Sequence, residues 1–239
     1  AVLVHDGAHN LLFSNPKIND FISQWFCAYP IFQDNRVYRP YHLKHHRFTE
    51  TDKDPDLALS APFPITRKSF FRKVVRDLSG LTGYRRYSQA LLSIFKTEGN
   101  NTLDKIKKIW LKIHGFLITN ALIFGVVSIF LDWTLFFLLW WLPAFTYYSL
   151  IIRIRNIAEH CVTSGSTDFD NTRTTLTNPI VRFLMAPHRV NYHLEHHLFI
   201  MCPWYNLPKA HSMMIENGYK DKMCIAKSYR SVLMKAVSA

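Results

Sequence analysis

Cysteine, glycine and proline are scarce in this chain of 239 residues, which contains 4 Cys, 8 Gly and 11 Pro. So little glycine and proline excludes collagen-like and low-complexity repeats. The cysteines lie far apart and form no C-x-x-C pair, which excludes a zinc ribbon and a disulfide scaffold. The zinc-protease motif H-E-x-x-H is also absent. At 49% hydrophobic residues the chain is too apolar to be disordered, and its length suits one domain.

Acidic residues are also few, because 17 Asp and Glu oppose 29 Lys and Arg. A basic excess can indicate nucleic-acid binding, but the sequence contains no nucleic-acid motif. Basic residues also gather on the cytoplasmic side of membrane proteins, and residues 34–112 hold 17 Lys and Arg against 8 Asp and Glu. We therefore attribute the charge to membrane topology and anionic lipid, and expect no nucleic-acid partner.

Two long uncharged runs stand on either side of Asp132: IHGFLITNALIFGVVSIFL (113–131) and WTLFFLLWWLPAFTYYSLII (133–152). Each is long enough to cross a bilayer core of roughly 30 Å. They predict an antiparallel transmembrane hairpin at 111–153, with Pro143 kinking the second helix. Basic residues flank both outer ends, which places those ends in the cytoplasm. A buried hairpin of a soluble protein is the alternative interpretation.

The chain begins at Ala1 with the apolar residues AVLV and shows no signal-peptide pattern. Their apolarity just before the first histidines predicts the cytoplasmic end of a membrane helix that starts before residue 1. We therefore expect further membrane helices ahead of this chain, and a multi-pass integral membrane protein.

Histidine is unusually frequent, with 12 residues in the chain. Eight fall into three groups with helical spacing, HDGAH (His5, His9), HLKHH (His42, His45, His46) and HLEHH (His193, His196, His197). Offsets of three and four residues place imidazoles on one face of a helix. A fourth element, RNIAEH, spaces Asn156 and His160 four apart just after the second apolar run. All lie outside the predicted spans on one side, so nine histidines can converge.

The number of imidazoles restricts which metal ions, and how many, the site could bind. A zinc site uses about three or four protein ligands, so nine imidazoles exceed the need of one zinc, and two metals fit better. Imidazole binds iron, copper, zinc and nickel alike. An all-nitrogen dinuclear site without thiolate favours oxygen activation by iron, which leaves a zinc hydrolase as the weaker interpretation.

The 32 residues between His9 and His42 include the apolar stretch INDFISQWFCAYPIF. Crossing a membrane and returning would take about 40 residues of helix, which is more than this segment offers. The sequence predicts an amphipathic or re-entrant element at the membrane interface, and a soluble cap helix is equally compatible with it.

The order H-x3-H, H-x2-H-H, H-x2-H-H around a membrane hairpin resembles the three histidine boxes of the membrane fatty acid desaturase superfamily. TDKDPD after the second box, RNIAEH after the hairpin and NYHLEHHLF with PWYNLPKAH resemble its bacterial acyl desaturase branch. The resemblance runs from His5 to about His211. It implies an all-α integral membrane fold with a cytoplasmic, histidine-rich cap. It also implies one desaturase domain over residues 1–239, with the first two boxes in 1–110, the hairpin in 111–153 and the cap in 154–239.

The resemblance further implies a non-haem di-iron centre and the residues that hold it. Its ligands would be His5, His9, His42, His45, His46, His160, His193, His196 and His197, with Asn156 contacting one iron through water. The implied substrates are dioxygen and an acyl lipid or acyl thioester. No His-Pro-Gly-Gly motif of a fused cytochrome is present, so a separate ferredoxin or cytochrome would donate electrons. Membrane lipid is the remaining expected partner.

Neutral imidazole ligands need hydrogen-bond partners that fix their tautomers. The candidates are Asp6, Asp54, Asp56, Glu159, Glu195 and His188, and a merely solvated side chain is the alternative for each. His211 is expected to cap or pack. Trp140, Trp141, Tyr147 and Tyr148 are expected to face lipid or core rather than a substrate channel.

Two other functions remain open at this point. One is a hydroxylase or ketolase of the same superfamily, although alkane hydroxylases carry an N-Y-x-E-H-Y-G element where this chain has NYHLEHH. The other is a non-catalytic metal-binding or transport protein. Transporters usually place ionisable ligands at mid-membrane, and the predicted hairpin has none.

Overall fold

The protein is almost entirely helical in the computed structural model, which describes residues 1–163, 165 and 167–239. The α-helices are α1 (Val2–Ala8), α2 (Pro16–Ile22), α3 (Asn35–Phe48), α4 (Leu57–Ser60), α5 (Arg67–Leu78), α6 (Leu81–Phe95), α7 (Thr102–Phe130), α8 (Trp133–Phe136), α9 (Leu142–Phe145), α10 (Tyr147–His160), α11 (Pro179–Met185), α12 (His193–Leu198), α13 (Leu207–Glu216) and α14 (Tyr229–Ala236). Two π-helical segments, η1 (Ser23–Ala28) and η3 (Phe137–Trp141), continue α2 and α8. The 3-10 turns are η2 (Tyr29–Ile31), η4 (Pro187–Arg189), η5 (Trp204–Asn206) and η6 (Lys220–Lys222). Two short parallel strands, β1 (Thr174–Thr175) and β2 (Ile225–Ala226), pair Thr174 with Ile225.

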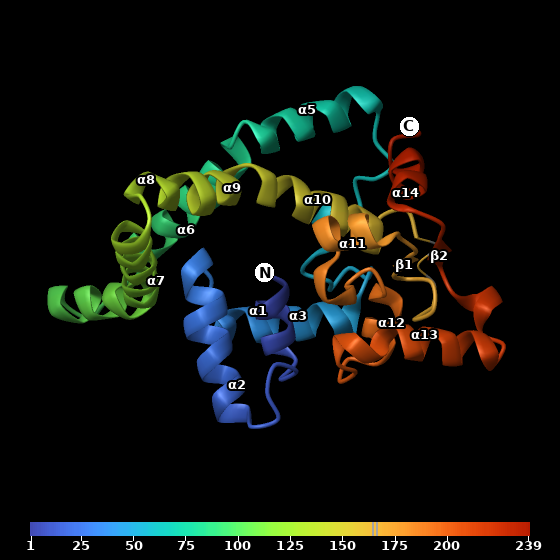
Figure 1. Ribbon diagram of the computed structural model, residues 1–239, viewed down its shortest axis with the longest axis horizontal. Helices are drawn as coiled ribbons and strands as arrows, with labels where there is room; N and C mark the ends of the chain where they lie inside the picture. The colour runs from blue at the N-terminus through green and yellow to red at the C-terminus, as the bar shows by residue number, and fades with distance from the viewer. Residues whose placement is uncertain (164, 166) are drawn as a thin grey trace.

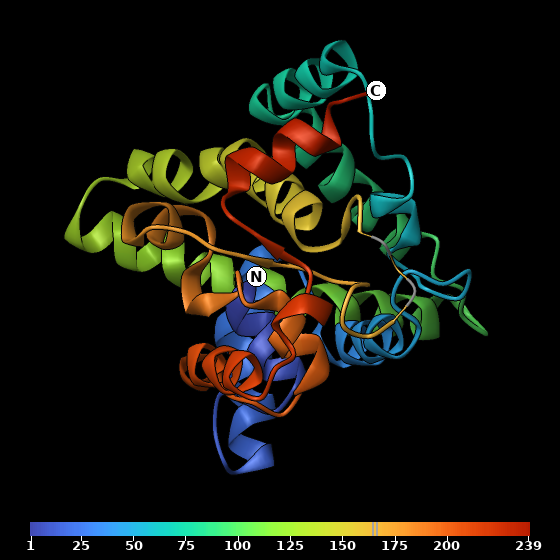
Figure 2. The ribbon, with the colours of Figure 1, turned by 90° about the vertical axis from the view of Figure 1, so that its right-hand side faces the viewer.

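The helices form an arch over the N-terminal segment. Figure 1 shows α5, α6 and α8–α10 arching over α1–α3, with α7 at one end and α11–α13 at the other. Figure 2 shows α14 lying beside α10, against which it packs. At the end of α10, the His160 ring lies against the rings of His45, His193 and His197.

The two apolar runs form the predicted pair of long helices. Both α7 and the interrupted helix from Trp133 to His160 are long and apolar enough to cross a membrane. Only 17% and 11% of their most apolar windows are buried, and Leu122, Ile129 and Phe130 on α7 are all exposed. Such low burial argues against the alternative of a buried hairpin in a soluble protein, whose apolar faces would be covered.

The second apolar helix is interrupted where Pro143 was expected to kink it. The turn before Pro143 widens into the π-helical segment η3, and α9 ends at Thr146, whose backbone angles (φ −104°, ψ −87°) are not helical. Proline lacks an N–H and clashes with the preceding turn, which explains the distortion. Beyond the interruption, α10 runs on to His160, its last residue.

The stretch between the first two boxes folds into one continuous helix, α2–η1–η2, that ends against α7. Asn120 Nδ2 donates to the carbonyl of Pro30 at 3.2 Å, and Gly115 lies against the Tyr29 ring. Both α7 residues lie inside the uncharged run, so these contacts favour a re-entrant element over a cap helix.

The end of α10 is held by a buried arginine. The Arg173 guanidinium donates to the carbonyls of Ile157, Ala158, Cys161 and Val162, at 2.8–3.4 Å. Carbonyls at a helix C-terminus lack intrahelical partners and carry the negative end of the helix dipole, so a cation there is stabilising. This contact fixes the turn of helix that bears Asn156 and His160.

Candidate metal centre and adjoining cavities

Four helices bring the histidine boxes together. Helix α1 carries His5 and ends at His9, α3 carries the second box, α10 ends at His160, and α12 carries the third box. The imidazoles separate into two groups, His5, His9, His42, His46 and His196 in one and His45, His160, His193 and His197 in the other. Within each group the candidate ligand atoms all lie within 4.8 Å of one another. We call them the five-histidine group and the four-histidine group.

Neighbouring histidines of one box belong to different groups. His45 and His46 are consecutive, as are His196 and His197, and each pair is divided between the two groups. Successive side chains on a helix point about 100° apart, so one box can supply two adjacent centres. The sequence predicted that the nine imidazoles converge, and the structure divides them five and four.

The spacing of the ring nitrogens fits metal coordination. In the five-histidine group His42 Nε2 lies 3.0 Å from Nε2 of both His9 and His46, and His46 Nε2 lies 3.1 Å from that of His196. In the four-histidine group His193 Nε2 lies 2.9 Å from His160 Nε2 and 3.1 Å from His197 Nε2. Ligands at right angles around a metal with bonds of about 2.1 Å are about 3.0 Å apart. Each group could therefore hold one metal ion.

Two aspartates and a threonine contact the outer nitrogens of these rings. Asp54 Oδ1 lies 2.8 Å from His45 Nδ1, and its carboxylate also accepts from the backbone N–H groups of Glu50 and Asp56. Asp6 Oδ1 lies 3.2 Å from His5 Nδ1. Thr49 Oγ1 lies 3.2 Å from His197 Nδ1. Contacts of this kind orient an imidazole and fix its tautomer.

The other predicted supporting residues lie farther from the rings. Asp56 Oδ2 is 3.8 Å from His45 Nδ1, and Glu159 Oε2 is 4.0 Å from His193 Nε2. His188 contacts Asp6 Oδ2 through Nδ1 at 2.8 Å rather than a candidate ligand. Glu195 is fully buried, lies 2.5 Å from His211 Nδ1 and also accepts from Thr174. His211 thus pairs with Glu195 instead of only capping or packing.

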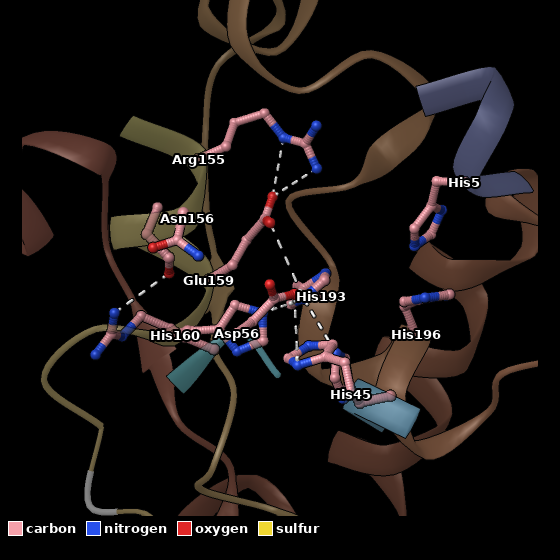
Figure 3. A network of polar contacts seen from close by, with 12 residues as sticks. His5, His45, Asp56, Arg155, Asn156, Glu159, His160, His193 and His196 are labelled. Atoms are coloured by element: carbon pink, nitrogen blue, oxygen red, sulfur yellow. Dashed lines mark hydrogen bonds and ion pairs between the residues drawn. The ribbon is translucent and has the colours of Figure 1, made fainter. Parts of the chain in front are cut away.

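Asn156 and Glu159 face the four-histidine group from α10. Figure 3 shows both side chains beside His160 and His193, with Arg155 paired to Glu159. Asn156 lines the same chamber as His45, His160 and His193, and its Oδ1 lies 3.8 Å from Cys161 Sγ. The sequence analysis missed the Arg155–Glu159 pair, although the i, i+4 spacing of opposite charges in RNIAEH could have revealed it.

The histidine boxes and their spacing agree with a known protein family. The family model described as fatty acid desaturase matches residues 1–226. The chain belongs to the fatty acid desaturase family. Dihydrorhizobitoxine desaturase from Bradyrhizobium elkanii is 28% identical over 260 residues, which cover 98% of this chain and 68% of that protein. The resemblance seen in the histidine boxes is confirmed, and the chain is a desaturase-like oxidoreductase.

Burial lowers the pKa of seven of these imidazoles and so favours their neutral form, which binds metals. Burial, with the neighbouring His5, lowers the pKa of His9 to about 3. Burial and the neighbouring His9 and His5 lower the pKa of His46 to about 2. Burial, together with neighbouring histidines that include His46, holds the pKa of His196 and His197 well below the ordinary value. Imidazoles that stay uncharged near neutral pH leave a metal ion without competing protons.

Two cavities meet beside the histidines. A chamber of about 220 Å³ is lined by His5, His42, His45, His160 and His193 together with Asn156 and Glu159. An apolar cavity of about 520 Å³ runs along the interrupted helix from Leu139 to Arg155 and is also lined by residues of α1 and α11. Ala1, Val2, Tyr148, Ile152 and Arg155 line both, so the two cavities share a wall.

The aromatic residues of the interrupted helix divide between cavity and core. Trp140, Tyr147 and Tyr148 line the apolar cavity, which the sequence analysis did not expect. Trp141 packs against Tyr87 and Phe116, in agreement with a core position. Trp140 and Trp141 are consecutive in the chain, and the sequence does not show which of the two faces the cavity.

Proposed function

We propose that this protein is a membrane-bound di-iron acyl desaturase that inserts a double bond into an acyl chain. The observation that carries the proposal is the wall shared by the apolar cavity and the histidine-lined chamber. A narrow apolar space can hold a hydrocarbon chain, and the shared wall would bring one segment of it beside the metal groups. Family membership supports the reaction class.

The five-histidine and four-histidine groups would each hold one iron ion. Asn156 lines the chamber beside the four-histidine group. It would contact the iron held there through a water molecule. Bound iron would supply the oxidant for an unactivated methylene, which no amino-acid side chain can provide. The protein's own part is to orient the ligands, hold the chain and keep bulk water away.

The reaction balances with dioxygen and an external donor. The acyl chain loses two hydrogen atoms, which amount to two electrons and two protons, and a carbon–carbon double bond forms. A separate ferredoxin or cytochrome-type protein would supply two more electrons, and solvent two more protons. Together they reduce dioxygen to two water molecules.

The proposal includes a multi-pass topology with the metal centre on the cytoplasmic face. The basic residues at both outer ends of the hairpin, Lys105, Lys107, Lys108 and Lys112 before it and Arg153 and Arg155 after it, support this orientation. The chain from residue 1 to 239 would act as a single desaturase domain.

A hydroxylase or ketolase of the same superfamily is the second candidate. Its chemistry would use the same histidines and differ in the fate of the substrate. The relative from Bradyrhizobium elkanii is named as a desaturase of dihydrorhizobitoxine. Desaturation in this family is therefore not confined to one type of substrate. The apolar lining of the cavity favours an acyl chain for this protein.

Metal content and product analysis test the proposal together. We would purify the full protein in detergent, with any segment that precedes residue 1 in its gene, and measure iron per chain. In parallel, gas chromatography would compare fatty acids from cells that express the wild type and His196→Ala. We expect two irons per chain and an unsaturated fatty acid in the wild type, and loss of both the five-histidine metal and the product in the variant.

The control is His114→Ala on α7, because His114 lies outside both histidine groups. It should retain both iron and product. Two irons with an oxygenated product would establish the hydroxylase instead, and the absence of iron from the wild type would refute both functions.

A further inference from the structure

A series of side-chain contacts leads from the five-histidine group to the protein surface. His5 Nδ1 lies 3.2 Å from Asp6 Oδ1, and the other carboxylate oxygen of Asp6 lies 2.8 Å from His188 Nδ1. The His188 ring in turn lies 4.9 Å from the Trp204 ring, centroid to centroid. Trp204 is 36% exposed. We call these four residues the Trp204 pathway, because they connect a candidate metal ligand to an exposed aromatic ring.

The Trp204 pathway extends farther than the orientation of a ligand requires. Asp54, the corresponding carboxylate beside His45, is buried and accepts from two nearby backbone N–H groups. A carboxylate held in that way is enough to orient an imidazole and fix its tautomer. Asp6 instead contacts a second ring, and that ring contacts a third. The two additional rings therefore indicate a role beyond the support of His5.

The backbone holds His188 and Trp204 in position. Ala186 and Val190, on either side of η4, are both buried. Between them His188 has a φ of 54°, in the left-handed region that is uncommon for residues other than glycine. Leu207, directly after η5, is buried as well, and η4 packs against η5. The contact between the two rings is thus set by the packing of these two turns.

The surface around Trp204 is aromatic and basic. Tyr205 is 63% exposed, and its ring meets the Trp204 ring edge to face. Arg182 and Arg189 line one pocket together with Trp204, and no acidic residue is among the walls that the structure describes. From residue 179 to residue 215 the one acidic residue of the sequence is Glu195, which is fully buried. Positive charge therefore surrounds two aromatic rings.

Such a surface suits a small acidic electron-carrier protein. Complementary charge steers two proteins toward each other and sets their orientation. Encounters between electron-transfer proteins bury little area, so a patch of a few arginines and aromatic rings is sufficient. The rate of electron transfer falls steeply with each gap through empty space. A continuous path of rings and hydrogen bonds between the docking surface and a metal ligand would therefore favour the transfer.

We propose that an acidic one-electron carrier docks over Trp204, Arg182 and Arg189, and that the Trp204 pathway conducts its electrons to the metal ion of the five-histidine group. In each transfer the reduced carrier loses one electron, which converts iron(III) at that group to iron(II), and no atom moves between the proteins. Two transfers supply the two external electrons of the reaction. The inference rests on the proposed di-iron desaturase function and identifies where its donor binds.

Binding of an acidic iron–sulfur ferredoxin to the metal-free full protein in uncharged detergent tests the docking surface. We expect Arg182→Gln with Arg189→Gln to raise the Kd by about tenfold, because two charge-assisted contacts are lost. Added salt should weaken binding by the wild type more than binding by the variant. The matched control is Arg72→Gln, an exposed arginine on α5, which should not change the Kd. Equal Kd values for wild type and double variant, or a wild type that does not bind ferredoxin, would overturn the docking surface.

Anaerobic stopped-flow reduction of the iron-loaded protein, without substrate, tests the pathway itself. At saturating reduced ferredoxin we expect Trp204→Leu to slow the reduction of bound iron(III) by about tenfold, because the continuous path is broken. Dithionite, a small reductant that needs no docking surface, should reduce wild type and variant at the same rate. Trp204→Phe keeps an aromatic ring and should give an intermediate rate. Trp133→Leu, a change at a 56% exposed tryptophan at the start of α8, should behave as the wild type.

The outcomes separate the pathway from the proposed function. An unchanged rate of reduction of Trp204→Leu by ferredoxin would overturn the inference. Equal slowing with ferredoxin and dithionite would also overturn it, because the iron site itself would then be disturbed. A wild type that ferredoxin reduces faster than Trp204→Leu, but that forms no desaturated product, would refute the proposed function and leave the pathway intact.

Discussion

At the residue scale, the candidate metal centre depends on side chains that contact the outer ring nitrogens of its histidines. Asp54 is buried and accepts from two backbone N–H groups as well as contacting His45, so its carboxylate has little freedom. Asp52, two residues earlier in TDKDPD, is exposed. The pair offers a matched comparison between a supporting carboxylate and a solvated one.

Asp54→Ala is expected to weaken metal binding at the four-histidine group by about 10–100-fold, the usual cost of losing such a partner. Metal released to a chelator of known affinity measures the effect, and the five-histidine group should retain its metal. Asp52→Ala should match the wild type. Identical metal release from both variants would show that Asp54 does not support the site.

At the element scale, close helix contacts depend on individual glycines. A Cβ at Gly115 would lie 2.2 Å from the Tyr29 ring, where the α2–η1–η2 helix meets α7. A Cβ at Gly125, also on α7, would meet nothing within 4 Å. The two glycines therefore differ in packing although both lie in the uncharged run of α7.

Gly115→Ala is expected to lower the free energy of unfolding by about 1–3 kcal/mol, because the ring and the helix must move apart. Gly125→Ala should be neutral or stabilise by up to about 1 kcal/mol, because alanine favours a helix. Unfolding in detergent, followed by circular dichroism, would measure both. A Gly115→Ala protein as stable as Gly125→Ala would contradict the close packing of the α2–η1–η2 helix against α7.

At the scale of the whole molecule, the apolar cavity exists only because α1, α11 and the interrupted helix meet. Ala144 lines it near Pro143, and its small side chain leaves space there. Under the proposed function, Ala144→Leu should raise KM for the longest accepted acyl chain by about tenfold and shift products toward shorter chains. Mass spectrometry of the products would show this. Ala121→Leu, exposed on α7, should leave the chain-length profile unchanged, and an equal shift in both variants would place the substrate elsewhere.

The sequence by itself determined the features that depend on local geometry. Helical spacing fixed which histidines share a face, and the length of the uncharged runs fixed the two long helices, because both follow from the rise and period of one helix. The order of the boxes was enough to indicate the family. Pro143 predicted the interruption for the same local reason, its missing N–H.

Only the tertiary structure decided which groups meet across the chain. His46 and His196 are 150 residues apart and join the same group, while His45, next to His46, joins the other. Glu195 pairs with His211 and Thr174, and the walls of the apolar cavity come from four separate segments of the chain. These contacts depend on how α1, α3, α10 and α12 come together in space. Such long-range packing is set by the whole fold rather than by any local spacing.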